Sequence, residues 1–492
     1  MKSKKITIIG GGLSGLSASC YLAKEGFEVT IVEKNESIGG RLSSFCQDGF
    51  TFDMGPSWYW MPDVFESFFS DFGKNIEDYY ELIRLNPSYK FFMENNEINI
   101  SKDINKIYSL FDDIEPGSSK QLKLFLEQAK MKYDVSMKHF IDLPNMKVSE
   151  YLSSSILKHS LSLDLFKSLR KHISKYFSSK MLREILEFPS MFLGGSPNNT
   201  PALYSLMNYA DIVNGTWYPM GGMIKIADAF KNLSSELGVN HITNDEISQF
   251  TINSNKISSI LSKKDNLYKS DLYISCSEYP HTQTELIDKK NRSYNKRYWS
   301  KKNIAPSALI FYLGISKKID NLEHHNLFFD KDFDQHLNEI FDKEVWPTEP
   351  LFYVCCPSKT DKTVVPKNSY ENLFILVPIG SNSVDNKDIR EKYFNQIMNR
   401  LEEKTGQNII DSIITKKSFC VNDFISRYNS YKGNAYGLAN TLLQTALFKP
   451  KIKDKIIKNL YYTGQFTVPG PGLPPAIISG KIVANEIIKG NS

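Results

Sequence analysis

Short apolar runs and one amphipathic stretch alternate over the first thirty-three residues. Residues 4–10 form a β-branched run, which predicts a buried strand. Apolar residues then recur at helical spacing across residues 14–25, and Gly26 follows, as a glycine often does after a helix. A second β-branched run, residues 28–32, ends at Glu33. The pattern predicts a strand, a turn, a helix and a second strand in that order.

Residues from about 90 to 215 lack glycine-rich punctuation, and we expect them to be mostly helical. Residues 118–121 resemble a capping box at the start of a helix. The apolar positions that follow are spaced i, i+3, i+4 and i+7, which predicts one buried helix face made of Leu122, Phe125, Leu126 and Ala129.

A second apolar stripe in this region is surrounded by basic residues and few acids. Its apolar members are Leu161, Leu165, Phe166, Leu169, Ile173 and Phe177. Its basic members are Lys158, Lys167, Arg170, Lys171, Lys175, Lys180 and Arg183. Such a stretch is either a core helix with a solvated basic face, which the sequence alone favours, or a surface that rests on anionic lipid. A substrate dissolved in the bilayer would add weight to the second interpretation.

The remainder of the chain mixes helical and strand patterns. Apolar runs separated by polar turns suggest a second, largely antiparallel sheet, at residues 308–313, 351–356 and 373–378. Elsewhere we expect a helix at 224–237, a strand–turn–strand at 238–247, a strand at 272–277, a strand at 459–464, a Gly/Pro-rich loop at 465–474 and a helix at 475–488.

Composition narrows the class of protein. The chain has 492 residues, enough for more than one domain, and a net charge of +5, too weak to suggest nucleic acid. Its six cysteines show no C-x-x-C spacing, which favours a reducing compartment and argues against a disulfide framework or a zinc site. No apolar run approaches the roughly 20 residues of a membrane-spanning helix. Residues 1–5 show no apolar leader, so we expect a soluble or peripheral, intracellular protein.

The N-terminal unit carries a dinucleotide fingerprint between its two strands. Gly10 allows the tight turn, Gly12 lets a pyrophosphate approach the backbone, and Gly15 lets helix and strand pack closely. The helix N-terminus offers N–H groups to phosphates. Glu33 can accept hydrogen bonds from both ribose hydroxyls, which argues against a 2′-phosphate. The alternative, an ordinary glycine turn, does not account for the strands, the helix and the acid together.

Two further segments follow at once. Gly39 and Gly40 let the backbone pass close to a ligand, and Arg41 can neutralise a pyrophosphate. Residues 49–57 form a strand that ends in a Gly-Pro turn. The aromatic cluster at residues 58–60 could line an apolar substrate channel or could be plain core, and the sequence does not separate the two.

Together these segments resemble the flavin-dependent amine-oxidase superfamily. Residues 58–66 make the chain most similar to the bacterial-type phytoene desaturases within it. In these families the Gly-Gly-Arg segment touches the FAD pyrophosphate, and the Met-Gly-Pro segment lies near the isoalloxazine. The turn at residues 218–223 resembles the family's return to the flavin domain, and residues 464–481 resemble its C-terminal FAD motif. The helix after that motif could face the pyrimidine edge of a flavin and stabilise its anionic reduced form.

The residues and the resemblance together predict an FAD site. We expect the cofactor to contact Gly10, Gly12, Leu13, Ser14, Gly15, Glu33, Lys34, Gly40, Arg41, Met54, Gly55, Pro56, Ser57, Ile247, Gly464, Gln465, Gly472, Leu473 and Pro474. The role of Ile247, packing on the adenine, is implied by the resemblance alone. No catalytic residue can be named and no metal ligand is expected. His281 has acids nearby, but we expect it to be structural because flavin dehydrogenation can proceed without a protein nucleophile.

The predicted fold is α/β, α+β overall. It comprises a Rossmann-like FAD-binding domain and a discontinuous substrate domain made of an antiparallel sheet plus a helical region. We expect FAD-binding segments at 1–85, 216–290 and 418–492, a helical substrate or membrane-contact region at 86–215 and a substrate-domain sheet at 291–417.

The resemblance implies an FAD-dependent oxidoreductase that desaturates a carotenoid, phytoene towards lycopene, by hydride transfer to flavin. Its partners would be a membrane-dissolved carotenoid, a lipid bilayer surface and quinone or oxygen as electron acceptor, with no nucleic acid. A cytoplasmic, peripherally membrane-associated protein would follow. The alternatives are another carotenoid-modifying flavoenzyme (a later-step desaturase, a ketolase or an isomerase), a soluble flavin amine oxidase, or a non-enzymatic flavoprotein at a lipid surface.

Overall fold

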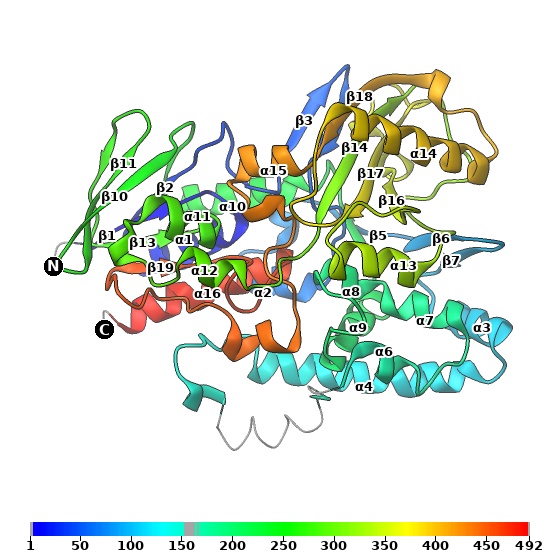
Figure 1. The fold of residues 1–492 in the computed structure, drawn as a ribbon, viewed down its shortest axis with the longest axis horizontal. Coiled ribbons are helices and arrows are strands. Elements are labelled where there is room, and N and C mark those ends of the chain that lie inside the picture. Colours follow the sequence, from blue (N-terminus) through cyan, green and yellow to red (C-terminus); the bar gives the residue numbers. More distant parts are fainter. Residues whose placement is uncertain (1–2, 152–162, 165–166, 491–492) are drawn as a thin grey trace.

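A parallel five-stranded sheet forms one end of the molecule (Figure 1). The computed structural model describes residues 3–151, 163–164 and 167–490. The strand order is β19-β13-β1-β2-β9, and every neighbouring pair is parallel. The strands are β1 (Lys5–Ile9), β2 (Glu28–Val32), β9 (Asn240–Ile242), β13 (Leu272–Ser275) and β19 (Leu460–Tyr462). The sheet therefore draws on both ends and the middle of the chain, and the predicted Rossmann-like fold is confirmed.

Three helices cover this sheet. They are α1 (Leu13–Lys24), α10 (Ile224–Glu236) and α16 (Leu473–Lys489), and α1 contacts both of the others. Gly480 of α16 makes the contact with α1 possible, since a Cβ there would lie 2.4 Å from the backbone oxygen of Ser14. A small antiparallel sheet projects beside them, formed by β10 (Ile247–Asn253), β11 (Lys256–Ser262) and β12 (Leu267–Tyr268).

A seven-stranded sheet forms the other end of the molecule, in the order β18-β14-β17-β16-β15-β6-β7. Its strands are β6 (Tyr89–Met93), β7 (Glu97–Ile100), β14 (Ser307–Ile315), β15 (His325–Phe329), β16 (Phe352–Cys355), β17 (Glu371–Ile379) and β18 (Ile413–Phe419). All neighbours are antiparallel except β6 and β15. The predicted second sheet is confirmed. The apolar side of helix α14 (Lys387–Thr405) packs on one face of this sheet.

The sequence analysis named runs that match β14, β16 and β17, did not identify β15 or β18, and assigned β6 and β7 to another kind of structure. It placed residues from about 90 onward in a helical region, but β6 and β7 form a hairpin at the edge of the large sheet. The aromatic side chains of β6 are buried on both faces, so the strand reads as a continuous apolar run without alternation. Such a short run cannot be distinguished from a helical segment by periodicity.

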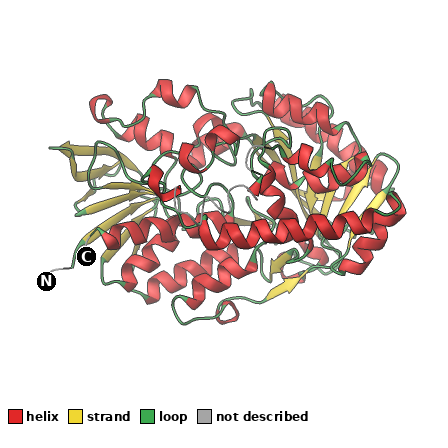
Figure 2. Cartoon of the chain, turned by 90° about the horizontal axis from the view of Figure 1, so that it is seen from below, coloured by secondary structure: helices red, strands yellow, loops and turns green. Residues whose placement is uncertain are grey.

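The helical region lies below the seven-stranded sheet in Figure 1. Figure 2 shows the two sheets at opposite ends of the view from below, with helices covering them. The helices of the helical region are α3 (Ile104–Ile114), α4 (Ser118–His139), α6 (Leu169–Ile173), α7 (Lys180–Glu187), α8 (Pro189–Phe192) and α9 (Leu206–Ile212). The remaining regular elements are β3 (Ser44–Gln47), β4 (Phe50–Asp53), α2 (Pro62–Ser70), β5 (Leu82–Arg84), β8 (Trp217–Pro219), α11 (Tyr279–His281), α12 (Lys296–Ser300), α13 (Phe333–Leu337) and α15 (Val421–Tyr428).

Helix α4 begins where predicted but without the predicted capping box. Its N-cap is Gly117, and no side chain caps it. The Asp112 carboxylate, from the preceding helix, accepts a hydrogen bond from the Ser119 N–H over 2.8 Å. A tertiary neighbour therefore satisfies an N–H that the local motif was expected to satisfy. The predicted buried face of Leu122, Phe125, Leu126 and Ala129 is confirmed.

The basic amphipathic stretch does not form one continuous helix in the described residues. Helix α6 ends at Ile173, and α7 begins only at Lys180. Leu169, Ile173 and Phe177 are buried in the main apolar core. The core interpretation therefore holds for these three positions. The other apolar members, Leu161, Leu165 and Phe166, lie outside the described residues, as does Lys158.

Among the helices that the structure describes, none combines the length and the apolar character needed to cross a bilayer.

Candidate functional site

One cavity of about 370 Å³ gathers the predicted cofactor residues at the carboxyl ends of the parallel strands. Ligands of open α/β sheets bind at this edge. Every predicted site residue except Gly15 lines it: Gly10, Gly12, Leu13, Ser14, Glu33, Lys34, Gly40, Arg41, Met54, Gly55, Pro56, Ser57, Ile247, Gly464, Gln465, Gly472, Leu473 and Pro474. Contact of these residues with a cofactor stays a prediction, but the structure brings them to one place from five segments of the chain.

The glycine loop between β1 and α1 has the shape that a pyrophosphate requires. Gly12 is the N-cap of α1, and no side chain caps this helix, so its first N–H groups face the cavity edge. Gly15 lies outside the cavity, where a Cβ would sit 2.8 Å from the Gly10 carbonyl oxygen. This close approach matches its predicted packing role. Gly40 lies against the same loop, since its Cβ would sit 3.1 Å from the Gly12 Cα.

Glu33 closes one end of this loop. Its carboxylate is buried, and Oε2 accepts a hydrogen bond from the Gly11 N–H over 2.7 Å. Oε1 accepts from the Asn35 N–H over 2.9 Å. Each carboxylate oxygen can accept more than one hydrogen bond, so the group is held in place while it still offers lone pairs to a ribose.

Arg41 enters the cavity from the Gly39–Gly40 turn and pairs with a buried acid that the sequence analysis did not select. Its Nη2 donates to Glu278 Oε1 over 3.0 Å, while its Nε is buried and has no hydrogen-bond partner among the described residues. Burial raises the pKa of Glu278, and the Arg41 charge opposes that rise. An anion beside Arg41 would satisfy the orphaned Nε, so this side chain suits a pyrophosphate.

Glu278 also organises the C-terminal loop. Gln465 Nε2 donates to its Oε1 over 2.6 Å, and the Tyr431 N–H donates to its Oε2 over 3.2 Å. Glu278 lies shortly after the end of β13 at Ser275, and a polar residue just beyond the end of an inner parallel strand is the signal that could have identified it.

The N-terminus of α16 lines the opposite wall. Gly472 is its N-cap with a φ of +113°, a backbone conformation that favours glycine, and Pro474 and Pro475 stand in the first turn. No side chain caps this helix, so its positive dipole end faces the cavity. The uncapped N-termini of α1 and α16, the Glu33 carboxylate and the Arg41 Nε that lacks a partner among the described residues together fit a dinucleotide that carries a flavin.

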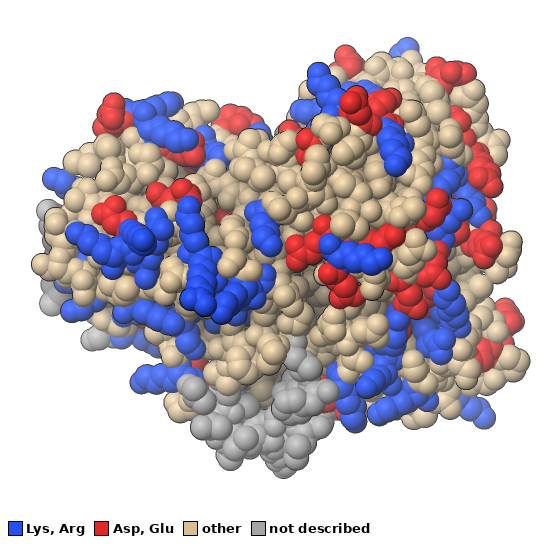
Figure 3. Space-filling view, in the orientation of Figure 1, with Lys and Arg blue, Asp and Glu red and all other residues tan. Residues whose placement is uncertain are grey.

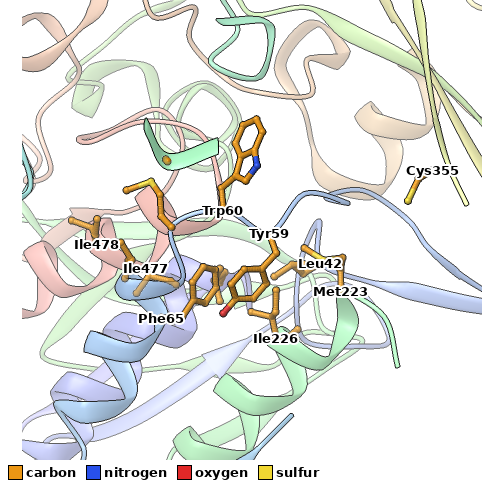
Figure 4. Close-up of a cluster of buried hydrophobic side chains, with 14 of the residues drawn as sticks. Leu42, Tyr59, Trp60, Phe65, Met223, Ile226, Cys355, Ile477 and Ile478 are labelled. Carbon is orange, nitrogen blue, oxygen red and sulfur yellow. The ribbon is translucent and has the colours of Figure 1, made fainter. Parts of the chain in front are cut away.

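The aromatic cluster at 58–60 divides between the two roles that the sequence left open. Trp58 and Trp60 line the cavity. Tyr59 is fully buried, stacks on Phe65 at 4.3 Å between ring centroids, and its hydroxyl lies 2.9 Å from that of Tyr80. Figure 4 shows Tyr59 pointing toward Phe65 and Ile226, and Trp60 pointing to the other side of the backbone. The tryptophans belong to the cavity wall and Tyr59 to the core.

A second, apolar space of about 40 Å³ continues from the first beneath the large sheet. The two share Phe192, Tyr353, Leu376 and Tyr436 in their walls. Its remaining lining is Phe188, Met191, Pro306, Leu327, Phe329, Ile340, Phe341, Leu351, Phe352 and Pro378. The sequence analysis did not assign these residues to a site, because they come from helices, strands and loops that are distant in sequence and meet only in the fold. The space offers an elongated apolar ligand a route away from the cofactor site.

His281 also lines the cavity, and its surroundings are those of a structural residue. Its Nε2 lies 3.2 Å from Asn429 Nδ2, and burial lowers its pKa from the ordinary value. The neutral ring is therefore held by a neighbour from α15 and its following turn. No acid–base pair in the described part of the cavity stands out as catalytic.

Comparisons with known proteins identify a family and relatives that this chain resembles. The model of the family "Flavin containing amine oxidoreductase" matches residues 13–488. The carotenoid 3,4-desaturase of Haloarcula japonica is 38% identical over 491 residues, which cover 99% of either chain. The 4,4′-diapophytoene desaturase of Staphylococcus haemolyticus is 30% identical, over 98% of either chain. The zeta-carotene-forming phytoene desaturase of Myxococcus xanthus is 28% identical, over 99% of this chain and 94% of its own.

Solved structures agree on the fold. An oxidoreductase from Methanosarcina mazei has a TM-score of 0.64 at 16% identity, covering 99% of this chain and all of its own. A putrescine oxidase variant has a TM-score of 0.62 at 13% identity, covering 99% of either chain. At these identities the likeness concerns the arrangement of the chain alone.

Proposed function

The chain belongs to the flavin-containing amine oxidoreductase family and is an FAD-dependent oxidoreductase, and from this premise we propose that it is a carotenoid desaturase acting on phytoene towards lycopene. The observation that carries the proposal is the apolar space that leads from the cofactor cavity beneath the large sheet. A hydrocarbon needs such a route and few polar partners. Relatives named as phytoene or diapophytoene desaturases align along nearly the whole chain and support this substrate.

The chemistry divides between the cofactor and the chain. FAD, when bound, supplies the acceptor for the hydride that a saturated carbon of the substrate gives up. Glu33, Arg41 and the N-termini of α1 and α16 bind and orient it. Trp58, Trp60 and the apolar walls exclude water and hold the polyene in line with the flavin end of the cavity. The proton that leaves the neighbouring carbon passes to a base that the geometry does not single out.

A later desaturation step is a second candidate. The relative of 38% identity is named a carotenoid 3,4-desaturase, and its match is higher than those of the phytoene desaturases reported above. Both reactions remove hydrogen from a carbon next to a double bond, so the same cavity would serve either substrate.

We also propose that the protein rests on a lipid surface on the side that carries α12 and the following C-terminal loops. Figure 3 shows lysine and arginine side chains gathered where α12 lies. Exposed basic residues there include Lys289, Lys290, Lys296, Arg297 and Lys301. In the C-terminal loops between α15 and β19, Leu443 is 73% exposed and Phe448 is 56% exposed. Such exposed apolar side chains suit insertion into the boundary of an anionic bilayer. Peripheral association at the cytoplasmic face and delivery of electrons to quinone or oxygen complete this proposal.

The segment boundaries are proposed on the same basis. FAD-binding segments 1–85, 216–290 and 418–492 each supply strands of the parallel sheet, and segment 291–417 supplies most of the large sheet. Segment 86–215 supplies helices and the β6–β7 hairpin.

Expression in cells that accumulate phytoene tests the function. Pigment with lycopene-like absorption supports phytoene as substrate. Colourless extracts from cells that contain FAD-loaded protein, together with further desaturation in cells that accumulate lycopene-type carotenoids, would replace phytoene with the later step. An unchanged pigment profile in both strains would contradict carotenoid desaturation.

A further inference from the structure

Three buried side chains with metal-binding atoms meet behind the cavity wall. His325 begins β15 and Cys355 ends β16, and the two are direct partners in the antiparallel pair. His324 precedes His325. One ring nitrogen of each histidine and the Sγ of Cys355 all lie within 4.8 Å of one another. The three residues are at most 4% exposed. None of the three lines the cofactor cavity, and no step of the proposed reaction involves them.

The hydrogen bonds of the two imidazoles leave one nitrogen of each without a partner. His324 Nδ1 lies 2.8 Å from Thr360 Oγ1, and His325 Nδ1 lies 2.6 Å from the Tyr353 hydroxyl. The Nε2 atoms of both rings are buried and have no hydrogen-bond partner among the described residues. Buried polar atoms in folded proteins are nearly always paired, and the two rings that carry these unpaired nitrogens lie 4.5 Å apart between centroids, so a missing ligand would account for both. Histidines that bind metals show this pattern, with one nitrogen held and the other on the ion.

We propose that His324, His325 and Cys355 bind one zinc(II) ion. Two imidazole nitrogens and a thiolate are ligands that zinc prefers, while calcium and magnesium require oxygen ligands. The Cys355 thiol loses its proton to solvent when the Zn–S bond forms. In a tetrahedral zinc site the ligand atoms lie about 3.5 Å apart, so ligand atoms that lie up to 4.8 Å apart must approach one another by up to about 1.3 Å.

A fourth ligand can come from water. A space of about 10 Å³, which Cys355, Ser57 and Tyr218 help to line, adjoins the cluster. That volume is close to the about 10–15 Å³ that one water molecule requires. The ion would thus have three protein ligands and a water in a closed setting.

Such an ion would brace the wall of the cofactor cavity. Trp58 stacks on the His325 ring at 4.2 Å between centroids and an interplanar angle of 11°. Tyr353 shares a hydrogen bond with His325, and both Trp58 and Tyr353 line the cavity. Fixing His325 would fix both of these side chains. The site is a positioning element and not a catalytic one.

The neighbouring Cys356 provides a matched control. It is as buried as Cys355, but its Sγ lies 3.2 Å from Glu371 Oε2 and does not belong to the cluster. Figure 4 labels Cys355 at the edge of the buried apolar cluster.

Zinc titration of the FAD-loaded full-length protein tests the proposal. After chelator treatment and dialysis, we expect about one zinc per chain by elemental analysis. Cobalt(II), used as a coloured substitute, should give a thiolate charge-transfer band. Cys355→Ala should weaken zinc binding by at least about tenfold and abolish the band, while Cys356→Ala should retain both.

Two further measurements keep the result interpretable. Flavin absorbance reports whether each variant folds, and His324→Gln replaces Cys355→Ala if that variant loses its flavin. FAD-loaded wild type that retains less than about a tenth of an equivalent of zinc would overturn the site. Equal zinc binding by wild type, Cys355→Ala and His324→Gln would overturn it as well. Because binding is read without substrate, failure of the carotenoid proposal leaves this test unaffected.

Discussion

Arg41 forms an ion pair with the buried carboxylate of Glu278 in the lining of the cofactor cavity, with Nη2 donating to Oε1 over 3.0 Å. The two residues are 237 positions apart, and Glu278 also accepts a hydrogen bond from the side chain of Gln465 in the C-terminal loop. A single carboxylate therefore links the three segments that surround the flavin site. Glu278→Gln should remove the charge that holds Arg41 and turn one of the two acceptor oxygens into an amide NH2, so we expect at least about tenfold weaker FAD retention.

Fluorescence titration of FAD into the apoprotein would measure that change. Glu285, which is exposed and follows on the same segment, provides a matched substitution to Gln that should leave FAD affinity unchanged. Equal affinities for the two variants would remove Glu278 from the site.

Glu33→Ala should also weaken FAD binding, because the ribose hydroxyls and the Gly11 N–H lose their acceptor. Loss of a charge-assisted hydrogen bond of this kind costs about 1.5–3 kcal/mol, which is about ten- to a hundredfold in affinity. Glu28→Ala on the same strand, where the side chain is exposed and pairs with Lys5, is the control. Undiminished flavin occupancy after purification of Glu33→Ala would contradict the assignment.

Gly12→Val should abolish FAD binding by blocking the approach of the pyrophosphate. The backbone φ of Gly12 is −71°, which a side chain can adopt, although a Cβ there would lie 3.3 Å from Cys276 Sγ and requires that side chain to shift slightly. Gly26→Ala introduces a side chain at a φ of +83° with open surroundings, and it should cost about 1 kcal/mol of stability while leaving the flavin bound. A normal flavin spectrum for Gly12→Val would refute this role.

The stability of the protein should depend on pH through Asp211. Burial raises the pKa of this carboxyl to about 7, and it accepts hydrogen bonds from Tyr89 and from Thr216, whose hydroxyl also receives Trp60 Nε1. The native state then binds a proton that the unfolded state has released, so this group's contribution is full below about pH 4 and is lost as pH rises to about 7.

Urea unfolding at about pH 5 and about pH 7 would measure this loss. Asp211→Asn should reduce the fall in unfolding free energy between these pH values by up to about 2–3 kcal/mol. Asp228→Asn, on the exposed side of α10, should not change it. The same slope in all three proteins would show that Asp211 is ionised in the native state.

The cavity wall and the core should respond differently within residues 58–60. Trp58→Ala should raise KM for a carotenoid severalfold with FAD retained, because Trp58 lines the cavity. Tyr59→Phe should leave KM unchanged and cost about 1 kcal/mol of stability through the lost hydrogen bond to Tyr80. Steady-state kinetics with thermal unfolding would separate the two, and a raised KM for Tyr59→Phe alone would reverse the assignment.

The sequence predicted those parts of the fold whose signals are local. The first strand, the glycine loop and Glu33 follow one another within thirty-three residues, and the helices at α4, α10 and α16 show clear periodicity. The strand pair β6–β7 was missed because its aromatic run is buried on both faces. The apolar extension and the His324–His325–Cys355 cluster were missed for a different reason. Their members meet only through pairing between distant strands, which no spacing along the chain records.

Anaerobic mixing of the FAD-loaded protein with phytoene, and separately with a lycopene-type carotenoid, in liposomes tests the central claim most directly. The account predicts that at least one of the two carotenoids reduces the flavin. The absorbance of the oxidised flavin should then fall, and the absorbance of that carotenoid should shift to longer wavelength in proportion. Flavin that is bleached by a primary amine such as putrescine, and by neither carotenoid, would contradict the account and identify an amine oxidase.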